Sequence, residues 1–337
     1  MSNLLHSKSV DTDVVLRAIA IALVAWNHAI PSGTKSLGLP DFAGGMTLLM
    51  MMSGYSFARF VLTDATPVEV RHGLMLFAKR ILLPSLAAVL FFMLIKRKVS
   101  LTELLFVSNW FTTYRIAIFP VWYVQVILQM MVLLLGLFAI PPFARWFVAQ
   151  PLRGSLVVFA AALATRMILP VFIDTKPLLH HLPHLYLWNF TLGWLVYFLH
   201  DRRTPGALTL ASLAILASGA MVWGPLSYQF LALVVGGLLL VWKTRMKLPM
   251  IVARVVGLVS QATFTIFLLH RFFFVVYTGT VGRILPAGLL MWALGLAACT
   301  LAWVVGAATL RAYHKLAAAG MAAAVPGAGL SPARTAG

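Results

Sequence analysis

The 337-residue sequence has few charged side chains and almost no cysteine. Charged residues make up 10% of the chain, and only 8 residues are Asp or Glu. A soluble domain carries about 25% charged residues, so this composition excludes an ordinary soluble enzyme. Cys299 is the only cysteine, which excludes an intramolecular disulfide and any metal site built on a pair of thiols.

Hydrophobic and basic residues are abundant instead. Hydrophobic residues make up 61% of the chain, and 26 Lys and Arg residues give a formal net charge of +18. A basic soluble protein would indicate nucleic acid as a partner. Here the basic residues lie between long apolar runs, where they flank membrane spans and meet anionic lipid headgroups. We therefore expect the lipid bilayer as a partner, and no nucleic acid.

Ten apolar runs are candidates for membrane-spanning helices. A spanning helix needs about 20 apolar residues because the hydrocarbon core is about 30 Å thick, and an isolated strand cannot satisfy its backbone there. The runs are Val14–Ile30, Gly45–Leu62, Leu74–Ile95, Val121–Ile140, Leu152–Phe172, Leu185–Leu199, Ala207–Trp223, Leu226–Trp242, Val255–Tyr277 and Ala287–Tyr313. The sequence thus predicts an all-α, polytopic membrane protein with about ten transmembrane helices.

The flanking charges predict the orientation of these helices. With alternating loops, 16 Lys and Arg residues lie on the side of the N-terminus, 7 on the other side and 3 within spans. Positive charge accumulates on the cytoplasmic side, so we expect both termini in the cytoplasm. The predicted organisation is a cytoplasmic N-terminal segment (1–13), a ten-helix membrane domain (14–315) and a disordered cytoplasmic tail (316–337), without a cleavable signal peptide.

Two polar residues of the first span are candidates for function because charged groups are costly in lipid. Arg17 and His28 are 11 positions apart. At about 100° per residue they share one helix face, with a separation of about 16 Å along the axis. We interpret this face as the wall of a cavity, with Arg17 in the inner leaflet and His28 in the outer half. The alternative is that each side chain reaches its nearer headgroup layer.

The ninth span repeats this arrangement. His270 and Arg271 follow an apolar run in a helix that runs outward, and Ser260 lies ten residues earlier. This order places His270 in the same half of the membrane as His28, where the two histidines would border a common chamber. Alone, His270 would be an ordinary residue of the membrane interface.

Further candidates lie in the second and third spans. Lys79 and Arg80 begin the third span, where they suit a phosphate-rich ligand or form a simple positive flank. In the second span, Ser53-Gly54-Tyr55 either breaks the helix or lets another backbone approach closely. Ser53 is a poor candidate for a nucleophile, since the spans offer no carboxylate for a catalytic triad.

Two other patterns are weak. His6 and Asp11 have the spacing used by soluble glycerolipid acyltransferases, but they lie in a polar tail without the pattern that should follow. His180, His181 and His184 lie in an outer loop between prolines and have no carboxylate beside them. We therefore expect no metal site.

The order of these features resembles acyltransferase family 3, a group of integral membrane proteins that includes O-antigen and exopolysaccharide O-acetyltransferases. The resemblance covers the chain from about Val10 to Phe272 and rests on five motifs in order. These are Asp13, Arg17, Ala20, Val24 and His28; Ser53-Gly54-Tyr55; Lys79-Arg80 before Pro84; Trp122-Tyr123 with Gln129; and Ser260, Phe264 and His270. The third is looser than the double arginine of the family, and no acidic residue within a span offers a partner for His28.

The resemblance implies an O-acyltransferase of the bacterial inner membrane. Acyl-coenzyme A, with acetyl as the expected acyl group, is the implied cytoplasmic co-substrate, and no bound cofactor is implied. The acceptor is a hydroxyl of a glycan or glycolipid. In this scheme Arg17 and Arg80 hold the donor, and His28 acts as general base or as transient acyl carrier. The alternative is a transporter or flippase in which Arg17, His28 and Arg271 line the substrate path.

Overall fold

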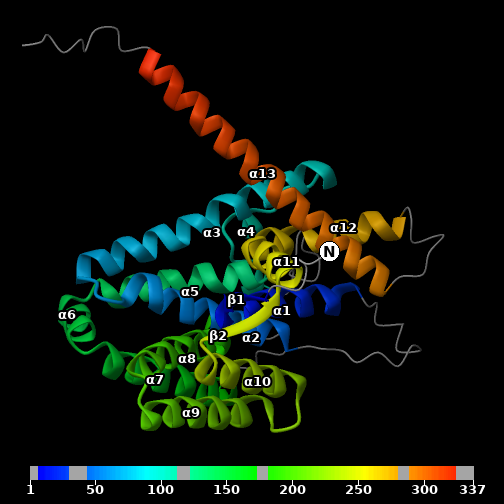
Figure 1. Ribbon diagram of the computed structural model, residues 1–337. Helices are drawn as coiled ribbons and strands as arrows, with labels where there is room; N and C mark the ends of the chain where they lie inside the picture. The colour runs from blue at the N-terminus through cyan, green and yellow to red at the C-terminus, as the bar shows by residue number, and fades with distance from the viewer. Residues whose placement is uncertain (1–6, 30–43, 112–121, 173–180, 280–287, 324–337) are drawn as a thin grey trace, which may run out of the picture.

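The computed structural model describes residues 7–29, 44–111, 122–172, 181–279 and 288–323 and is almost entirely helical (Figure 1). The helices of the first half are α1 (Thr12–Ala29), α2 (Gly45–Phe57), the π-helical η3 (Ala58–Leu62), α3 (Pro67–Lys96), α4 (Leu101–Leu104), the 3-10 helix η4 (Ser108–Trp110), α5 (Trp122–Phe138), α6 (Pro141–Ala149) and α7 (Pro151–Phe172). Those of the second half are α8 (Pro183–Arg202), α9 (Pro205–Trp223), α10 (Tyr228–Trp242), α11 (Met250–Gln261), α12 (Thr263–Gly279) and α13 (Leu289–Ala323).

Each of the ten expected spans coincides with a helix or a pair of helices, so the all-α membrane architecture is confirmed. The count of ten is not. Within the described ranges, six helices are long and apolar enough to cross a membrane, or up to eight if each of two bent pairs is one span. Helix α10, with 15 residues, falls short of the length.

The first bent pair, α5 and α6, turns by 96°. Pro141 and Pro142 begin α6. A proline disfavours helical geometry in the residue before it, so α5 ends ahead of this pair.

The ninth span, which we expected to be one continuous helix, consists of the second bent pair. Helices α11 and α12 meet at Ala262 with a bend of 80°. The Thr263 hydroxyl donates to the carbonyl oxygens of Ser260 (2.7 Å) and Val259 (3.3 Å), next to the break. Neither proline nor glycine marks this position, so the apolar run alone gave no sign of it.

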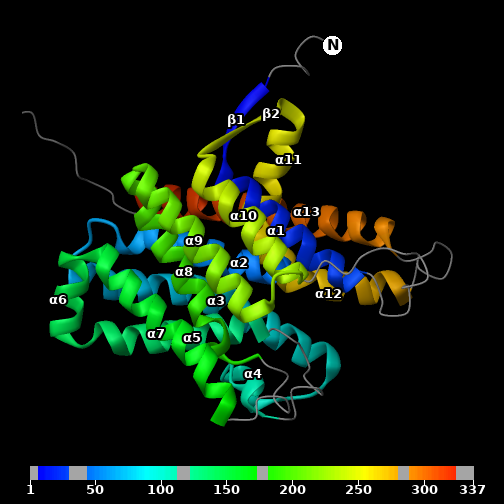
Figure 2. The ribbon, with the colours of Figure 1, turned by 90° about the horizontal axis from the view of Figure 1, so that it is seen from below.

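A two-stranded ribbon is the element that the sequence analysis missed. Strand β1 (Ser7–Asp11) pairs antiparallel with β2 (Arg245–Pro249), with Asp11 opposite Arg245. Arg245 Nε donates to Asp11 Oδ1 at 3.0 Å. The ribbon and α11 project from the same side of the helical body (Figure 2). The ribbon joins the segment before α1 to the connection between α10 and α11.

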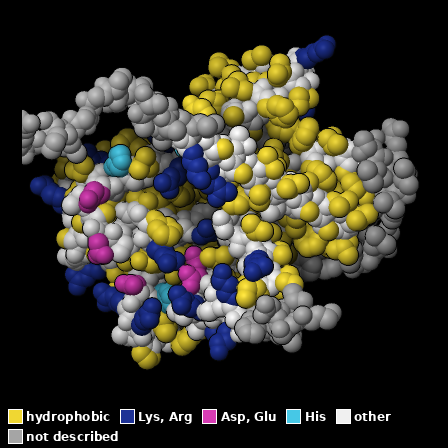
Figure 3. Space-filling view, turned by 45° about the horizontal axis from the view of Figure 1, so that its top comes forward, with side chains coloured by type: hydrophobic (Ala, Val, Ile, Leu, Met, Phe, Trp, Pro, Cys, Tyr) yellow, Lys and Arg dark blue, Asp and Glu magenta, His cyan; other side chains and the backbone are white. Residues whose placement is uncertain are grey.

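The surface of the long helices is apolar where lipid would contact it. Helices α3 and α13 bury only 22% and 17% of their most apolar windows within the protein. Hydrophobic side chains cover a broad part of one face, whereas Lys, Arg, Asp and Glu gather elsewhere on it (Figure 3). Helix α13 continues to Ala323, past residue 316 where we expect the tail to begin, and the rest of that tail lies outside the described residues.

Two glycines let α2 and α8 touch backbone to backbone. A Cβ atom at Gly54 would overlap the carbonyl group of Phe190, and one at Gly193 would overlap the backbone of Met51 and Tyr55. Helix α2 runs unbroken through Ser53 and Gly54. The Ser-Gly pair therefore serves close approach rather than a break.

We expect Gly54→Ala to lower stability by about 1–3 kcal/mol, the usual cost of overpacking, because the added methyl group forces α2 away from α8. The measurement is the thermal unfolding of the purified protein in detergent. Gly136→Ala on α5 is the matched control, since a Cβ there meets nothing within 4 Å. Equal unfolding temperatures for the two variants would contradict the close contact.

Candidate active site

Arg17 lines a partly open cavity of about 300 Å³ between the helices. The cavity lies between α1, α2, α3, α5 and the break between α11 and α12. Its polar lining consists of Arg17, Ser53, Ser56, Arg80, Tyr123, Ser260, Gln261 and Thr263. Six residues of the sequence motifs thus line one cavity: Arg17, Ser53, Arg80, Tyr123, Ser260 and Phe264.

One carboxylate holds Arg17 in position. Arg17 Nη2 donates to Ser56 Oγ at 2.8 Å and lies 3.7 Å from Asp13 Oδ2, one helical turn earlier. The same oxygen of Asp13 lies 3.5 Å from Arg59 Nη1. Asp13 is only 7% exposed, whereas the side chains of Arg17 and Arg59 are 30% and 41% exposed, so a buried carboxylate is shared by two arginines that solvent reaches.

Ser53 faces the cavity but has no base beside it. The Ser53 hydroxyl bonds to the Leu49 carbonyl (2.9 Å) and to the Tyr123 hydroxyl (2.9 Å). Among the described residues no histidine or carboxylate is hydrogen-bonded to Ser53. The sequence analysis missed Ser56 as a cavity residue, although its position three residues after Ser53 puts it on the same helix face.

His28 lies outside this cavity and contacts His270 directly. His270 Nε2 is 2.9 Å from His28 Nδ1, and the two ring centroids are 4.9 Å apart. We expected the two histidines to border a common chamber; the structure places them in direct hydrogen-bond contact. Phe267 connects the two regions, because it lines the Arg17 cavity and its ring centroid lies 6.0 Å from that of His270.

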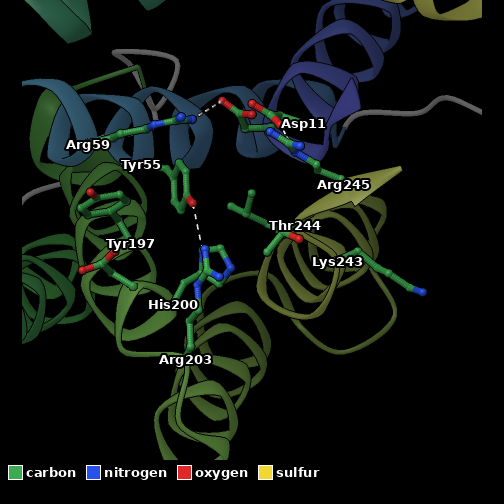
Figure 4. Close-up of a pocket in the computed structure, with 12 residues that line it drawn as sticks. Asp11, Tyr55, Arg59, Tyr197, His200, Arg203, Lys243, Thr244 and Arg245 are labelled. Carbon is green, nitrogen blue, oxygen red and sulfur yellow. Dashed lines mark hydrogen bonds and ion pairs between the residues drawn. The ribbon is translucent and has the colours of Figure 1, made fainter. Parts of the chain in front are cut away.

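Tyr55 faces away from the Arg17 cavity into a second one of about 260 Å³ (Figure 4). Its hydroxyl bonds to His200 Nδ1 at 3.0 Å. The cations of this cavity are Arg59, Arg203, Lys243 and Arg245, and its carboxylates are Asp11, Asp13 and Asp201. Neighbouring residues of α2 therefore serve two cavities, and Asp13 lies where the cavities approach each other.

The other predicted residues lie elsewhere. Lys79 and Arg271 are exposed and line neither cavity. The Trp122 ring stacks on His181 at 4.1 Å between centroids and 6° between planes. Gln129 belongs to a buried polar cluster beneath η4.

The amide group of Gln129 is fully occupied within the protein. It donates to the Phe106 carbonyl (2.7 Å) and to Asn109 Oδ1 (2.8 Å). Its oxygen accepts from Trp110 Nε1 (2.9 Å) and Asn109 Nδ2 (3.2 Å). These contacts fasten the segment around η4 to α5.

Replacing Gln129 by Leu removes the donor for the Phe106 carbonyl and for Asn109 Oδ1, whereas Asn109 Nδ2 keeps its bond to the His181 carbonyl. We expect a loss of stability of about 1–3 kcal/mol for each polar group left unpaired. Unfolding of Gln129→Leu in detergent, compared with Gln129→Glu, measures the effect, because the glutamate keeps the acceptor oxygen for Trp110. If Gln129→Leu unfolds at the wild-type temperature, this cluster does not stabilise the fold.

The described residues contain no group of three His, Cys, Asp or Glu that could hold a metal ion. His6 and His180, which belong to the two weak histidine patterns, lie outside the described residues. Asp11 of the first pattern pairs with Arg245.

An apolar helical body with a buried histidine contact and several long apolar helices is the architecture of a polytopic membrane protein. The chain matches the family model described as an acyltransferase domain over residues 10–309. It belongs to this family, and the protein is an integral membrane protein of the acyltransferase class. No curated protein and no solved structure matches the chain.

Proposed function

We propose that the protein transfers an acyl group, in the first place acetyl, from acyl-coenzyme A to a hydroxyl of a carbohydrate or glycolipid. The observation that carries the proposal is the placement on α1 of Arg17 in a cavity and of His28 in a histidine pair further along the same helix. The family match over residues 10–309 supports acyl transfer as the class of reaction.

Basic side chains that line the two cavities could bind the phosphate groups of a coenzyme A donor. Asp11 and Asp13 pair with arginines, but in the described part of the chain no carboxylate lies within ion-pair distance of Arg80, Arg203 or Lys243. Phosphate oxygens are good acceptors for such side chains. The orientation expected from the loop charges puts these cations toward the cytoplasm, where acyl-coenzyme A is supplied.

The Arg17 cavity could hold the narrow arm of such a donor, which carries the acyl group. Its walls are mostly apolar, with Met52, Phe77, Phe264 and Phe267 among the lining residues. Arg17 would hold the donor from the cytoplasmic side, and the acyl end would reach past Phe267 toward His28. His28 would then accept the proton of the attacking hydroxyl, or carry the acyl group itself until the acceptor arrives.

His28→Ala and Arg17→Ala are expected to abolish acyl transfer while the protein still inserts and folds. Loss of a general base costs about 10²–10⁴-fold in rate. The assay is transfer of label from acetyl-coenzyme A in membranes that contain equal amounts of each variant. His72→Ala is the control, since His72 is exposed on α3. Full activity of purified His28→Ala would end this mechanism.

The transport alternative predicts a different product. Label from acetyl-coenzyme A that becomes covalently attached to a glycan or lipid supports the enzyme, whereas redistribution of an unmodified solute supports a transporter. Exposure of Arg271 and its absence from both cavities remove one of the three residues assigned to a substrate path. Mass spectrometry of glycans and lipids from cells with and without the protein identifies the acceptor.

A further inference from the structure

Two hydrogen bonds run in series from the backbone of α12 to His28. The Ile266 carbonyl oxygen lies 2.8 Å from His270 Nδ1, and His270 Nε2 lies 2.9 Å from His28 Nδ1. His270 is only 2% exposed. Its ring is further confined by Phe267 and Phe274, whose centroids lie 6.0 Å and 5.7 Å away. The orientation of the His270 ring is therefore fixed by its surroundings.

The chemistry of the three groups determines where the protons lie. A carbonyl oxygen only accepts, so His270 Nδ1 must carry a hydrogen and donate to Ile266. A neutral imidazole has one N–H, so His270 Nε2 is an acceptor. His28 Nδ1 must then donate to it, so His28 Nε2 is the nitrogen that carries the lone pair.

Both rings are neutral in this arrangement because nothing nearby balances a charge. In the described part of the chain no carboxylate lies within ion-pair distance of either histidine. Arg271, the residue after His270, adds a positive charge next to the pair rather than a negative one. Burying an unpaired charge is costly, so the neutral pair is the stable form.

We propose that His270 is a positioning residue that holds His28 in the tautomer whose Nε2 is the reacting nitrogen. This inference rests on the proposed function and deepens it. His270 takes the place that a carboxylate has in a hydrolase triad, where it orients the base through Nδ1. It supplies the partner for His28 that no acidic residue within a span offers.

Both routes of the proposed reaction use the same nitrogen. In the base route, Nε2 takes the hydroxyl proton as the acceptor oxygen bonds to the acyl carbon. The carbon–sulfur bond breaks, and the proton passes from Nε2 to the departing thiolate. In the carrier route, Nε2 itself bonds to the acyl carbon, and the thiolate leaves with the electron pair. The Nδ1–H of the resulting acyl-imidazolium is shared with His270 until the acceptor oxygen bonds to the acyl carbon. The carbon–nitrogen bond then breaks, the hydroxyl proton passes to the thiolate, and His28 is neutral again.

Two substitutions separate positioning from simple packing. His270→Gln keeps an acceptor oxygen for His28 Nδ1 and an amide N–H for the Ile266 carbonyl, whereas His270→Leu fills similar space without either. We expect His270→Leu to lower kcat by about 10- to 100-fold, the effect of losing groups that orient other functional histidines. His270→Gln should recover most of the activity, and His72→Leu should leave it unchanged. Equal loss in the Leu and Gln variants overturns the proposal.

The tautomer is measured directly on the full chain in detergent micelles. Ring ¹⁵N signals of His28, identified by their loss in His28→Gln, should show a protonated Nδ1 and an unprotonated Nε2. His270→Leu should mix the two tautomers. A proton on Nε2 of His28 in the wild type overturns the proposal even if His270→Leu fails to fold. If no acyl transfer is detected at all, the proposed function fails while this spectrum still decides the tautomer.

Discussion

The backbone contact between α2 and α8 is the constraint on which the site depends. Because Gly54 and Gly193 have no side chains, α2 lies directly against α8 in the middle of the protein. Asn189 reinforces the contact by donating to the Thr47 carbonyl at 2.7 Å. With α2 held there, two residues on either side of Gly54 point in opposite directions: Ser53 toward α5, and Tyr55 toward α8. A bulkier contact would displace the walls of both cavities together.

The interior chemistry is arranged along α1. Arg17, near its beginning, belongs to a cavity with apolar walls, and His28, near its end, belongs to a pair of rings without a charged partner. The break between α11 and α12 serves both places. Its Ser260 borders the cavity, and α12 carries His270 to the other end of α1. One helix and one broken helix therefore position an arginine and a histidine pair in different parts of the helical body.

Periodicity and span length were enough to predict the helices, but not that His28 lies outside the cavity that Arg17 lines. They were not enough for features that depend on contacts between distant segments. The β1–β2 ribbon pairs residues more than two hundred positions apart, and the bend at Ala262 has no proline or glycine to mark it. His270 was placed beside His28 by depth alone, whereas the hydrogen bond between them requires the rotation of α12, which no local pattern contains.

Asp13 carries a consequence for how the two cavities behave. It is a single counterion for Arg17, which lines one cavity, and for Arg59, which lines the other. An anion that binds Arg59 neutralises part of the Arg59 charge, so the Asp13 carboxylate interacts more strongly with Arg17. An anion that binds Arg17 strengthens the interaction of Asp13 with Arg59 in the same way. Occupancy of one cavity thus changes the charge felt in its neighbour without any movement of the helices, so the two cavities are electrostatically coupled.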